Sequence, residues 1–297
     1  MTGIIIGIIE QGLIYGIMAM GIYISYKILN FPDLSVDGTF PLGAAVSTAL
    51  MVAGVNPWLC LLAAFFCGCI AGAVTGFFNV KLKIKDLLAG ILTMTALYSI
   101  NYRIVGAPNK FLMQETTIFS IFDNIPEQLA PYKYLIWILV ITLLSKFLLD
   151  WYMRTKSGFL LRSVGDNEGL VVTLAQNPGA VKVIGLSIAN GLVALAGALN
   201  CQRNMQFDIS SGTGIMVMGL AAVIIGTTVF KKVSFLRVTT GVLFGMIIYK
   251  ACITAAISSG LMSSDTNLIV TLLFVVTLVA NRALSKRSGK GAVGTDA

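Results

Sequence analysis

Charged residues are scarce in this sequence. Only 11% of its 297 residues are Asp, Glu, Lys or Arg, whereas about 25% is usual for a soluble domain. Hydrophobic residues make up 57% of the chain, and its mean hydropathy is +0.87. Too few polar residues are present to cover a water-facing surface, which excludes an ordinary soluble enzyme, a disordered protein and a coiled coil. We therefore expect a polytopic membrane protein.

Several chemical signatures are missing as well. Histidine is absent, and the five cysteines lie in or beside apolar stretches without metal-ligand spacing. There is no phosphate loop of the form G-x-x-x-x-G-K-[ST], so any ATP must be hydrolysed by another subunit. No nucleophile–base set shares a helical face, and no basic patch is interleaved with aromatic residues. We predict that the chain is not an enzyme, holds no metal or cofactor and binds no nucleic acid.

Hydrophobic runs predict an all-α transmembrane bundle of about nine spans. A membrane-spanning helix needs about 20 apolar residues. The second predicted span is shorter than that, which indicates a broken or re-entrant helix, or one that extends back through Phe31–Gly38. The N-terminus lacks the basic region of a signal peptide, so we expect it to be the first span. The predicted spans are Ile4–Tyr26, Thr39–Ala53, Trp58–Val80, Asp86–Val105, Tyr134–Met153, Val181–Cys201, Thr213–Phe230, Ser234–Ile257 and Thr266–Ala283.

The distribution of basic residues predicts the orientation. Loops on the basic side should face the cytoplasm and the anionic membrane lipid. This places the C-terminus inside and, with an odd number of spans, the N-terminus outside. The long external loop Gly106–Pro131 is then either a solvated cap or a docking surface for an extracellular partner. Most of the 21 Lys and Arg residues lie on the basic side: Lys27, Lys81, Lys83, Lys85, Arg154, Lys156, Arg162, Lys182, Lys231, Lys232, Arg237, Arg282, Lys286, Arg287 and Lys290.

Two segments of the chain resemble one another. The first motif, Phe31–Val46, reads FPDLSVDGTFPLGAAV, and the second motif, Phe207–Val223, reads FDISSGTGIMVMGLAAV. The spans before them point in opposite directions, which is the pattern of an inverted-repeat transporter. Aspartate and irregular backbone are tolerated in a membrane where protein or water surrounds them, although the aspartates can also simply cap helices. The residues predicted to line the solute path or act as hinges are Asp33, Ser35, Asp37, Gly38, Thr39, Asp208, Ser210, Gly212 and Thr213.

The longest internal loop, Arg154–Gly179, predicts a short helix that begins at a cap. Apolar residues at positions 170, 171 and 174 are expected on one exposed face, and Asn177-Pro178 ends the segment. The polar residues are acids and amides, not the Lys and Arg of a helix that lies on lipid, which favours docking into a partner protein. The predicted docking residues are Asp166, Asn167, Glu168, Leu170, Val171, Leu174 and Gln176.

Small residues and loops define the predicted organisation. Glycines spaced four residues apart predict close helix contacts at Gly68, Gly72 and Gly76, and at Gly241 and Gly245. We expect a single transmembrane domain over residues 1–287, followed by a disordered cytoplasmic tail over 288–297. Within the domain, the first repeat covers about 4–105 and the second about 181–283. Between them lie the linking span 134–153 and the coupling loop 154–180.

The motifs resemble those of a known family. The stretch PDLSVDGTFPLGAA resembles the D-L-S-V-G-S motif of ribose-type sugar permeases and the corresponding stretch of branched-chain amino acid permeases. The run DISSGTGIMVMGLAAVIIGTT resembles the second signature of both, and Arg162–Ala198 resembles their coupling loop and following span. The resemblance extends from Gly12 to Arg282 and is closest to Gram-positive permeases whose binding proteins often take tryptophan or tyrosine. Asp37 stands where the ribose-type motif has glycine, which disfavours a sugar.

This resemblance implies the permease subunit of an ABC importer in a bacterial cell membrane. Such a permease pairs with a second copy of itself, and two cytoplasmic ATPases, which bind ATP and Mg²⁺, dock on the coupling helices, here Asp166–Gln176. An extracellular solute-binding lipoprotein delivers the solute, which the resemblance implies is an aromatic or branched-chain amino acid. A sugar or nucleoside importer is the alternative within this class. The other classes are an ion-gradient carrier with Glu10 or the aspartates as proton sites, and an intramembrane enzyme or scaffold.

Overall fold

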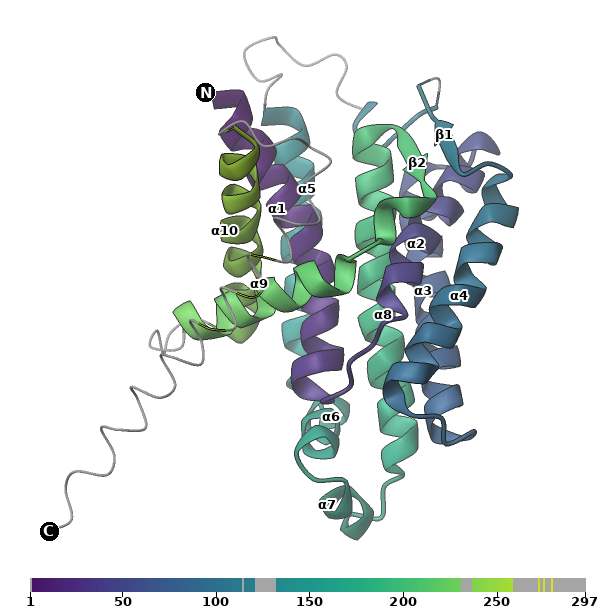
Figure 1. Ribbon diagram of the computed structural model, residues 1–297, viewed down its shortest axis with the longest axis vertical. Coiled ribbons are helices and arrows are strands. Elements are labelled where there is room, and N and C mark those ends of the chain that lie inside the picture. Colours follow the sequence, from purple (N-terminus) through teal and green to yellow (C-terminus); the bar gives the residue numbers. More distant parts are fainter. Residues whose placement is uncertain are drawn as a thin grey trace, which may run out of the picture.

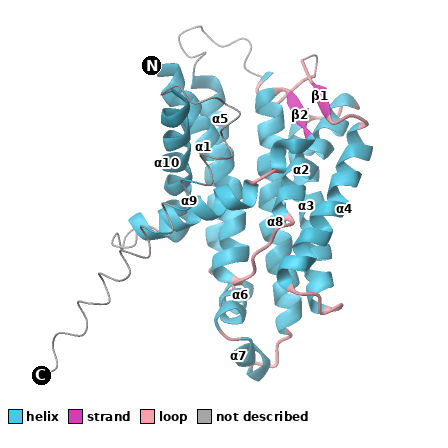
Figure 2. Ribbon diagram, in the orientation of Figure 1, coloured by secondary structure: helices cyan, strands magenta, loops and turns pink. Residues whose placement is uncertain are grey.

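The computed structural model describes residues 2–113, 115–120, 132–230 and 237–258, together with Leu272, Val275 and Val279. Within these ranges the chain forms a helical bundle with one short pair of strands (Figure 1, Figure 2). The N-terminus and both strands lie at one end, here named the β1–β2 end, and two short helices form the opposite α6–α7 end (Figure 1). The elements are α1 (Thr2–Ile22), η1 (Tyr23–Ile28), α2 (Val36–Val52), α3 (Pro57–Val80), α4 (Asp86–Val105), β1 (Asn109–Phe111), α5 (Lys133–Tyr152), α6 (Lys156–Asp166), α7 (Glu168–Thr173), α8 (Pro178–Asn204), β2 (Gln206–Asp208), η4 (Ile209–Gly212), α9 (Ile215–Val229) and α10 (Val238–Ser258).

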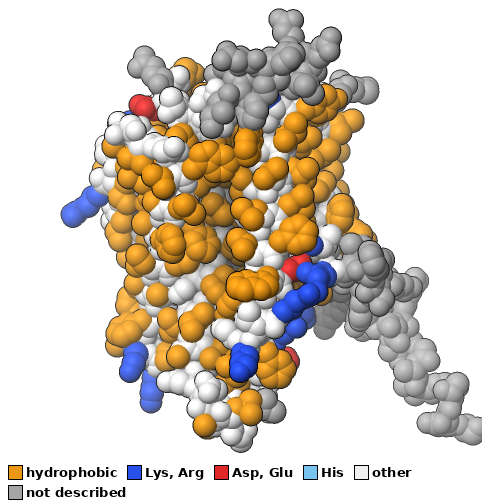
Figure 3. Space-filling view, turned by 180° about the vertical axis from the view of Figure 1, so that it is seen from behind, with side chains coloured by type: hydrophobic (Ala, Val, Ile, Leu, Met, Phe, Trp, Pro, Cys, Tyr) orange, Lys and Arg blue, Asp and Glu red, His pale blue; other side chains and the backbone are white. Residues whose placement is uncertain are grey.

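Among the described residues, six helical segments are long and apolar enough to cross a membrane. The middle of the bundle carries mainly hydrophobic side chains on the face seen in Figure 3. Helix α4 has the predicted bounds but is not among the six, and α2 is apolar but only 17 residues long. The predicted span Thr266–Ala283 lies outside the described residues except for three positions. The six segments are Gly3–Ile28, Pro57–Val80, Lys133–Tyr152, Pro178–Asn204, Ile209–Val229 and Val238–Ser258.

Helices α2 and α9 begin inside the bundle and not at one of its ends (Figure 1). Helix α1 runs into the π-helix η1, after which Asn30 adopts the left-handed conformation (φ 52°) and the chain returns to start α2. An asparagine tolerates this conformation better than most residues. On the other side, Met205 (φ 49°) ends α8, and Gly214 (φ 79°) precedes α9, which runs obliquely across the bundle (Figure 1). Both predicted motifs therefore interrupt helices.

Glycines allow the closest helix contacts in the bundle. On α3, a Cβ atom at Gly72 would clash with the carbonyl oxygen of Leu186 on α8, and one at Gly76 would lie 3.0 Å from Val183 Cα. Gly68 faces the same helix, so all three glycines of this row meet α8. Gly245 and Gly241 of α10 lie against α9 in the same way. The glycine spacing in the sequence thus corresponds to helix packing within one chain.

Candidate functional site

The first and second motifs meet in the middle of the bundle. Asp37, in the first turn of α2, accepts hydrogen bonds from the first backbone amides of α9. The Gly214 amide donates to its Oδ2 (3.2 Å) and the Met216 amide donates to its Oδ1 (2.8 Å). A carboxylate at this position satisfies amides that have no partner within their own helix and balances the positive end of the helix dipole. Asp37 therefore caps a helix that lies 177 residues further along the chain.

A close backbone contact strengthens this junction. Pro41 lies inside α2 and has no amide hydrogen, so the carbonyl of Asp37 has no donor four residues later. Gly212 packs onto this carbonyl, and a Cβ atom at Gly212 would clash with its oxygen. The side chain and the carbonyl of Asp37 thus both face the second motif. The sequence predicted both Asp37 and Gly212 as path or hinge residues, but it did not predict that they are in contact.

Asp33 belongs to a buried network of neutral partners. The Ser35 amide donates to Asp33 Oδ1 (2.9 Å), and the Asn190 side-chain amide donates to Asp33 Oδ2 (2.7 Å). The Ser35 hydroxyl donates to Asn190 Oδ1 (3.1 Å), which closes a ring of three side chains. All three are buried, and Gly90 of α4 packs directly over the backbone amides of residues 34 and 35. Asp33 therefore caps its own turn, as one reading of the sequence predicts, and also joins the first motif to α8.

Asn101 of α4 holds the next part of the first motif. Its side-chain amide donates to the Gly38 carbonyl oxygen (3.0 Å), and a Cβ atom at Gly38 would lie 3.0 Å from Met94 Cα. The Thr39 hydroxyl donates back to the Ser35 carbonyl (2.9 Å). Asn101 and Asn190 were visible in the sequence as amides in apolar spans, which indicates an internal partner but not which one.

The second motif is more exposed than the first. The Ser210 amide donates to Asp208 Oδ1 (2.8 Å), so Asp208 caps the short η4 turn. Ser210 and Thr213 are both exposed, whereas Gly212 between them is buried. The structure thus brings Gly212, the last residue of η4, onto Asp37, whereas Asp208 at the start of this turn bonds within the second motif, to the Ser210 amide.

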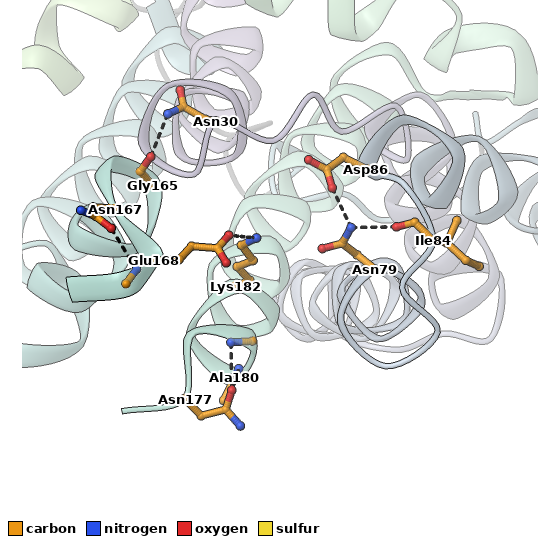
Figure 4. A network of polar contacts seen from close by, with 12 residues as sticks. Asn30, Asn79, Ile84, Asp86, Gly165, Asn167, Glu168, Asn177, Ala180 and Lys182 are labelled. Atoms are coloured by element: carbon orange, nitrogen blue, oxygen red, sulfur yellow. Dashed lines mark hydrogen bonds and ion pairs between the residues drawn. The ribbon is translucent and has the colours of Figure 1, made fainter. Parts of the chain in front are cut away.

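The α6–α7 end differs from the predicted single helix. The loop forms α6 and then the six-residue α7, and the Asn167 side chain caps α7 by accepting from the Gly169 amide (2.9 Å) (Figure 4). Val171 is fully buried, whereas Val172 and Leu174 are 58% and 50% exposed. The expectation that Val171 shares an exposed face with Leu174 is therefore wrong. Such a short helix follows its tertiary contacts and not an apolar period.

An open groove of about 590 Å³ separates α6 from the residues after α7. Its apolar part comes from Phe159, Leu160 and Leu174, and its polar part includes Arg154, Lys156 and Gln176. Phe159 is 62% exposed. Asp166, Asn167 and Glu168 are exposed beside it, and Glu168 pairs with Lys182 of α8 (Figure 4). Of the predicted docking residues, Leu174 and Gln176 line this groove. The side chain of Leu170 lies outside the part of the chain that the structure describes.

The α6 helix is connected to the first motif through backbone. A Cβ atom at Gly165 would clash with the carbonyl oxygen of Ile28, the last residue of η1, so α6 lies directly on this π-helix. The Asn30 side chain donates to the Gly165 carbonyl (2.9 Å) (Figure 4). Three residues after Asn30 comes Asp33. Helix α6, which forms one side of the groove, is therefore linked to the Asp33 network through the Gly165 contact and the short stretch of chain from Asn30 to Asp33.

Asp150 anchors α5 to α10 near the same end. Its Oδ2 pairs with Lys146 (3.2 Å) and Arg237 (2.8 Å), and its Oδ1 accepts from the Thr239 hydroxyl (2.7 Å). The carboxylate is buried, and a buried carboxylate is stable only with such a complete set of partners. Lys146 lies four residues earlier on the same helix, whereas Arg237 and Thr239 lie more than 80 positions away, so their contacts with Asp150 could not be inferred from the sequence.

The β1–β2 end carries a second pocket, of about 410 Å³. Strand β1 pairs antiparallel with β2, and the Leu112 amide donates to the Met205 carbonyl (2.9 Å). Gln202 accepts from the Ile118 amide (3.2 Å), which fixes the segment after β1. Arg203 of α8 donates from Nε (3.0 Å) and Nη2 (2.7 Å) to Glu10 Oε2 of α1. The lining of this pocket includes Phe111, Met113, Phe119, Tyr134 and Arg203.

Comparison with known proteins identifies the class. The chain matches the family model described as "Branched-chain amino acid transport system / permease component" over residues 4–280. It is 40% identical to the tyrosine transport system permease protein of Clostridioides difficile, over 98% of this chain and 96% of the relative. Uncharacterized protein RP368 of Rickettsia prowazekii is 32% identical over 93% and 96%, and the ribose import permease protein RbsC of Escherichia coli is 28% identical over 74% and 68%. No solved structure matches the chain.

These findings, with the six apolar helices, define a multi-pass permease of the cell membrane. The chain belongs to the family of branched-chain amino acid transport system permease components. The resemblance stated from the two motifs is therefore confirmed. The roles of individual motif and loop residues stay predictions, as do the repeat and tail boundaries.

Proposed function

We propose that this chain is the translocating subunit of an ABC importer that brings an amino acid into the cell. The favoured solute is an aromatic amino acid. The observation that carries this proposal is the 40% identity, over nearly the full length of both chains, to a tyrosine transport permease. The ribose permease relative is less similar and covers less of the chain, so a sugar is the weaker alternative. Energy comes from a separate ATPase, which binds ATP and Mg²⁺, because the sequence contains no phosphate loop.

In this proposal the α6–α7 end faces the cytoplasm and the β1–β2 end faces outward. The loops at the α6–α7 end carry Lys and Arg, and these side chains gather in the lower part of the face shown in Figure 3. The positive-inside rule assigns such an end to the cytoplasm. A second copy of the chain, an extracellular solute-binding lipoprotein and membrane lipid complete the assembly. About nine spans and an inverted repeat remain part of the proposal.

The ATPase docks in the groove between α6 and Leu174. An apolar groove with exposed Phe159 and Leu174 suits a helix or loop of a partner protein, and its polar rim supplies specificity. Movement of the groove passes through Gly165 and Asn30 to the first motif. From there it reaches α9 through the Asp37 cap. In this way a change at the cytoplasmic end alters the junction of the two motifs, where we place the hinge.

Reconstitution tests this function. The chain is combined in proteoliposomes with its ATPase and binding protein, and uptake of radiolabelled L-tyrosine, L-leucine and ribose is measured with and without ATP. We expect ATP-dependent uptake of tyrosine above the other two solutes. Uptake by the chain alone that stops when an ionophore collapses the gradient would instead support an ion-gradient carrier. The pairing of Glu10 with Arg203 disfavours that class, because it occupies one candidate proton site.

The docking surface has its own test. Leu174→Asp places a charge in the apolar part of the groove and is expected to abolish co-purification of the ATPase. Leu174→Met is the matched control, because it keeps an apolar side chain of similar size. Both variants should retain the fold, since residue 174 is half exposed. Unchanged association and uptake in Leu174→Asp would remove the groove from the proposal while leaving the transport function in place.

A further inference from the structure

The pocket at the β1–β2 end has the volume of a small-molecule site, and its lining comes from several parts of the fold. Its volume, about 410 Å³, falls within the range of roughly 300–1,000 Å³ that is typical of ligand pockets. The wall is built by residues distant in sequence, namely Phe111, Met113 and Phe119, the start of α5 and the end of α8. Hydrogen bonds from Leu112 to Met205 and from Ile118 to Gln202 tie the residues around β1 to the end of α8, and Phe119 packs edge-on against Tyr134 of α5. The pocket is therefore part of the fold and not a gap between loose loops.

Arg203 presents a fixed cation to this pocket. Only its Nε and Nη2 atoms bond to Glu10, and among the described residues its Nη1 has no hydrogen-bond partner. The guanidinium carbon lies 4.2 Å from the centre of the Tyr134 ring, and Phe119 meets the same ring edge-on at 5.4 Å. Tyr134 is thus a positioning residue that holds the guanidinium. A planar guanidinium with free donors is the usual partner of a carboxylate.

Glu10 holds this cation in place. Its Oε2 accepts from both Nε and Nη2 of Arg203. Arg203 is among the residues that line the pocket, and Glu10 is not. The pair therefore presents to the pocket one remaining donor group, Nη1 of Arg203, which complements a carboxylate.

The rim of the pocket is apolar. Phe111 and Met113 are 65% and 79% exposed, although both are large hydrophobic side chains. Such side chains next to a polar cavity are typical of a binding site, and a thioether favours contact with an aromatic ring. The Phe119 and Tyr134 rings are already engaged with each other, so Phe111 and Met113 are the surfaces left for a ligand.

We infer that this pocket binds one aromatic amino acid, with its carboxylate on Arg203 and its ring against Phe111 and Met113. The inference rests on the proposed function, in which the β1–β2 end faces outward and receives the solute. It adds a solute site within the permease itself. The permease then discriminates between solutes in addition to the binding protein.

Equilibrium binding of radiolabelled L-tyrosine to the full chain in lipid nanodiscs, without ATPase or binding protein, tests this site. We expect saturable binding that L-phenylalanine displaces. L-leucine, which lacks the ring, should compete less well because it loses the aromatic contacts with Phe111 and Met113. Tyramine, which lacks the carboxylate, should compete at least about tenfold less well, since hydrogen bonds to charged groups carry that much affinity or more. Phe111→Ala should weaken binding of tyrosine without affecting the fold, because the side chain is exposed.

The charged pair is tested with a double variant that replaces both partners, so that no buried charge is left without its counter-ion. Arg203→Gln alone would leave Glu10 buried without its cation, so it is compared with Glu10→Gln/Arg203→Gln, in which two amides can bond to each other. Both are expected to lose tyrosine binding. Binding retained by the double variant, or by Phe111→Ala together with Met113→Ala, would overturn the assignment of the site.

The outcomes separate this inference from the proposed function. If the reconstituted transporter takes up tyrosine but the full chain alone shows no saturable binding, the inference is overturned and the function stands. If Phe111→Ala releases the binding protein while the wild type binds no tyrosine, the pocket is a protein-docking surface, and the inference again fails. If the assembled transporter takes up no tyrosine, the proposed function itself is wrong, and the solute site fails with it.

Discussion

The carboxylate of Asp37 gives the sharpest test of the junction between the two motifs. It accepts from the backbone amides of Gly214 and Met216, so replacing it by glycine removes both hydrogen bonds from the start of α9. Loss of a helix cap costs typically ~1 kcal/mol, with a range of about 0.5–2 kcal/mol. The interaction with the helix dipole adds about 0.3–1 kcal/mol. We therefore expect Asp37→Gly to lower the free energy of unfolding by about 1–3 kcal/mol.

Asp37→Asn separates the two contributions. The amide oxygen can still accept from Met216, which is the shorter of the two bonds, but the charge is lost. We expect about half the loss seen with glycine. Asp208→Ala is the matched control, because Asp208 caps only its own short turn through the Ser210 amide. It should cost less than Asp37→Gly, and it should leave the position of α9 unchanged.

Thermal unfolding in detergent provides the assay, with a thiol-reactive dye as the reporter. Cys60 and Cys201 are buried and become reactive only when the bundle opens. A loss of 1 kcal/mol lowers Tm by roughly 2–4 °C in a domain of about 200 residues, so the expected shift is easily measured. Equal Tm values and equal tyrosine uptake for wild type and Asp37→Gly would refute the argument that Asp37 joins the motifs. A larger shift for Asp208→Ala would do the same.

Three further substitutions test other contacts. Asn190→Leu leaves the buried Asp33 carboxylate without its side-chain amide donor and should cost at least about 1–3 kcal/mol by the same thermal assay, whereas Asn190→Gln should recover part of it. Gly165→Ala forces α6 away from η1, and we expect reduced uptake at unchanged ATPase association; wild-type uptake would disprove the proposed connection. Asp150→Asn removes the charge that Arg237 and Lys146 share and should destabilise the chain by about 1–3 kcal/mol, because Arg237 is 44% exposed and its charge can be solvated; an unchanged Tm would contradict the role of Asp150 as an anchor.

The sequence predicts local features of this fold well. Helix α4 has the bounds expected from its apolar run, and Asn177-Pro178 caps and begins α8 as expected from their residue types. The interruption of helices at both motifs followed from glycine, proline and aspartate in apolar surroundings. These features depend on residues close together in the chain, so composition and spacing are sufficient to find them.

Contacts across the bundle were not predictable in the same way. The donors to Asp37 are backbone amides, which every helix start possesses, so no residue type marks them. Asn190 was visible as a polar residue in an apolar span, but its partner could not be chosen. Glu10 was named in the sequence as a candidate proton site, and its partner Arg203 lies 193 positions away. Val171 was assigned to the wrong side because six residues are too few for a period to decide.

The π-helix η1 makes this part of the chain sensitive to register. Its backbone hydrogen bonds join residues five positions apart, as in the bond from the Leu29 amide to the Ile24 carbonyl, whereas those of an α-helix join residues four apart. Each turn of η1 therefore contains about one residue more than a turn of α-helix. Conversion to α-helix would rotate everything that follows by about 100°. Asn30 would then leave Gly165, and Asp33 would leave Asn190, in a single step. One change in a backbone hydrogen-bond pattern therefore suffices to release the first motif from both of its neighbours.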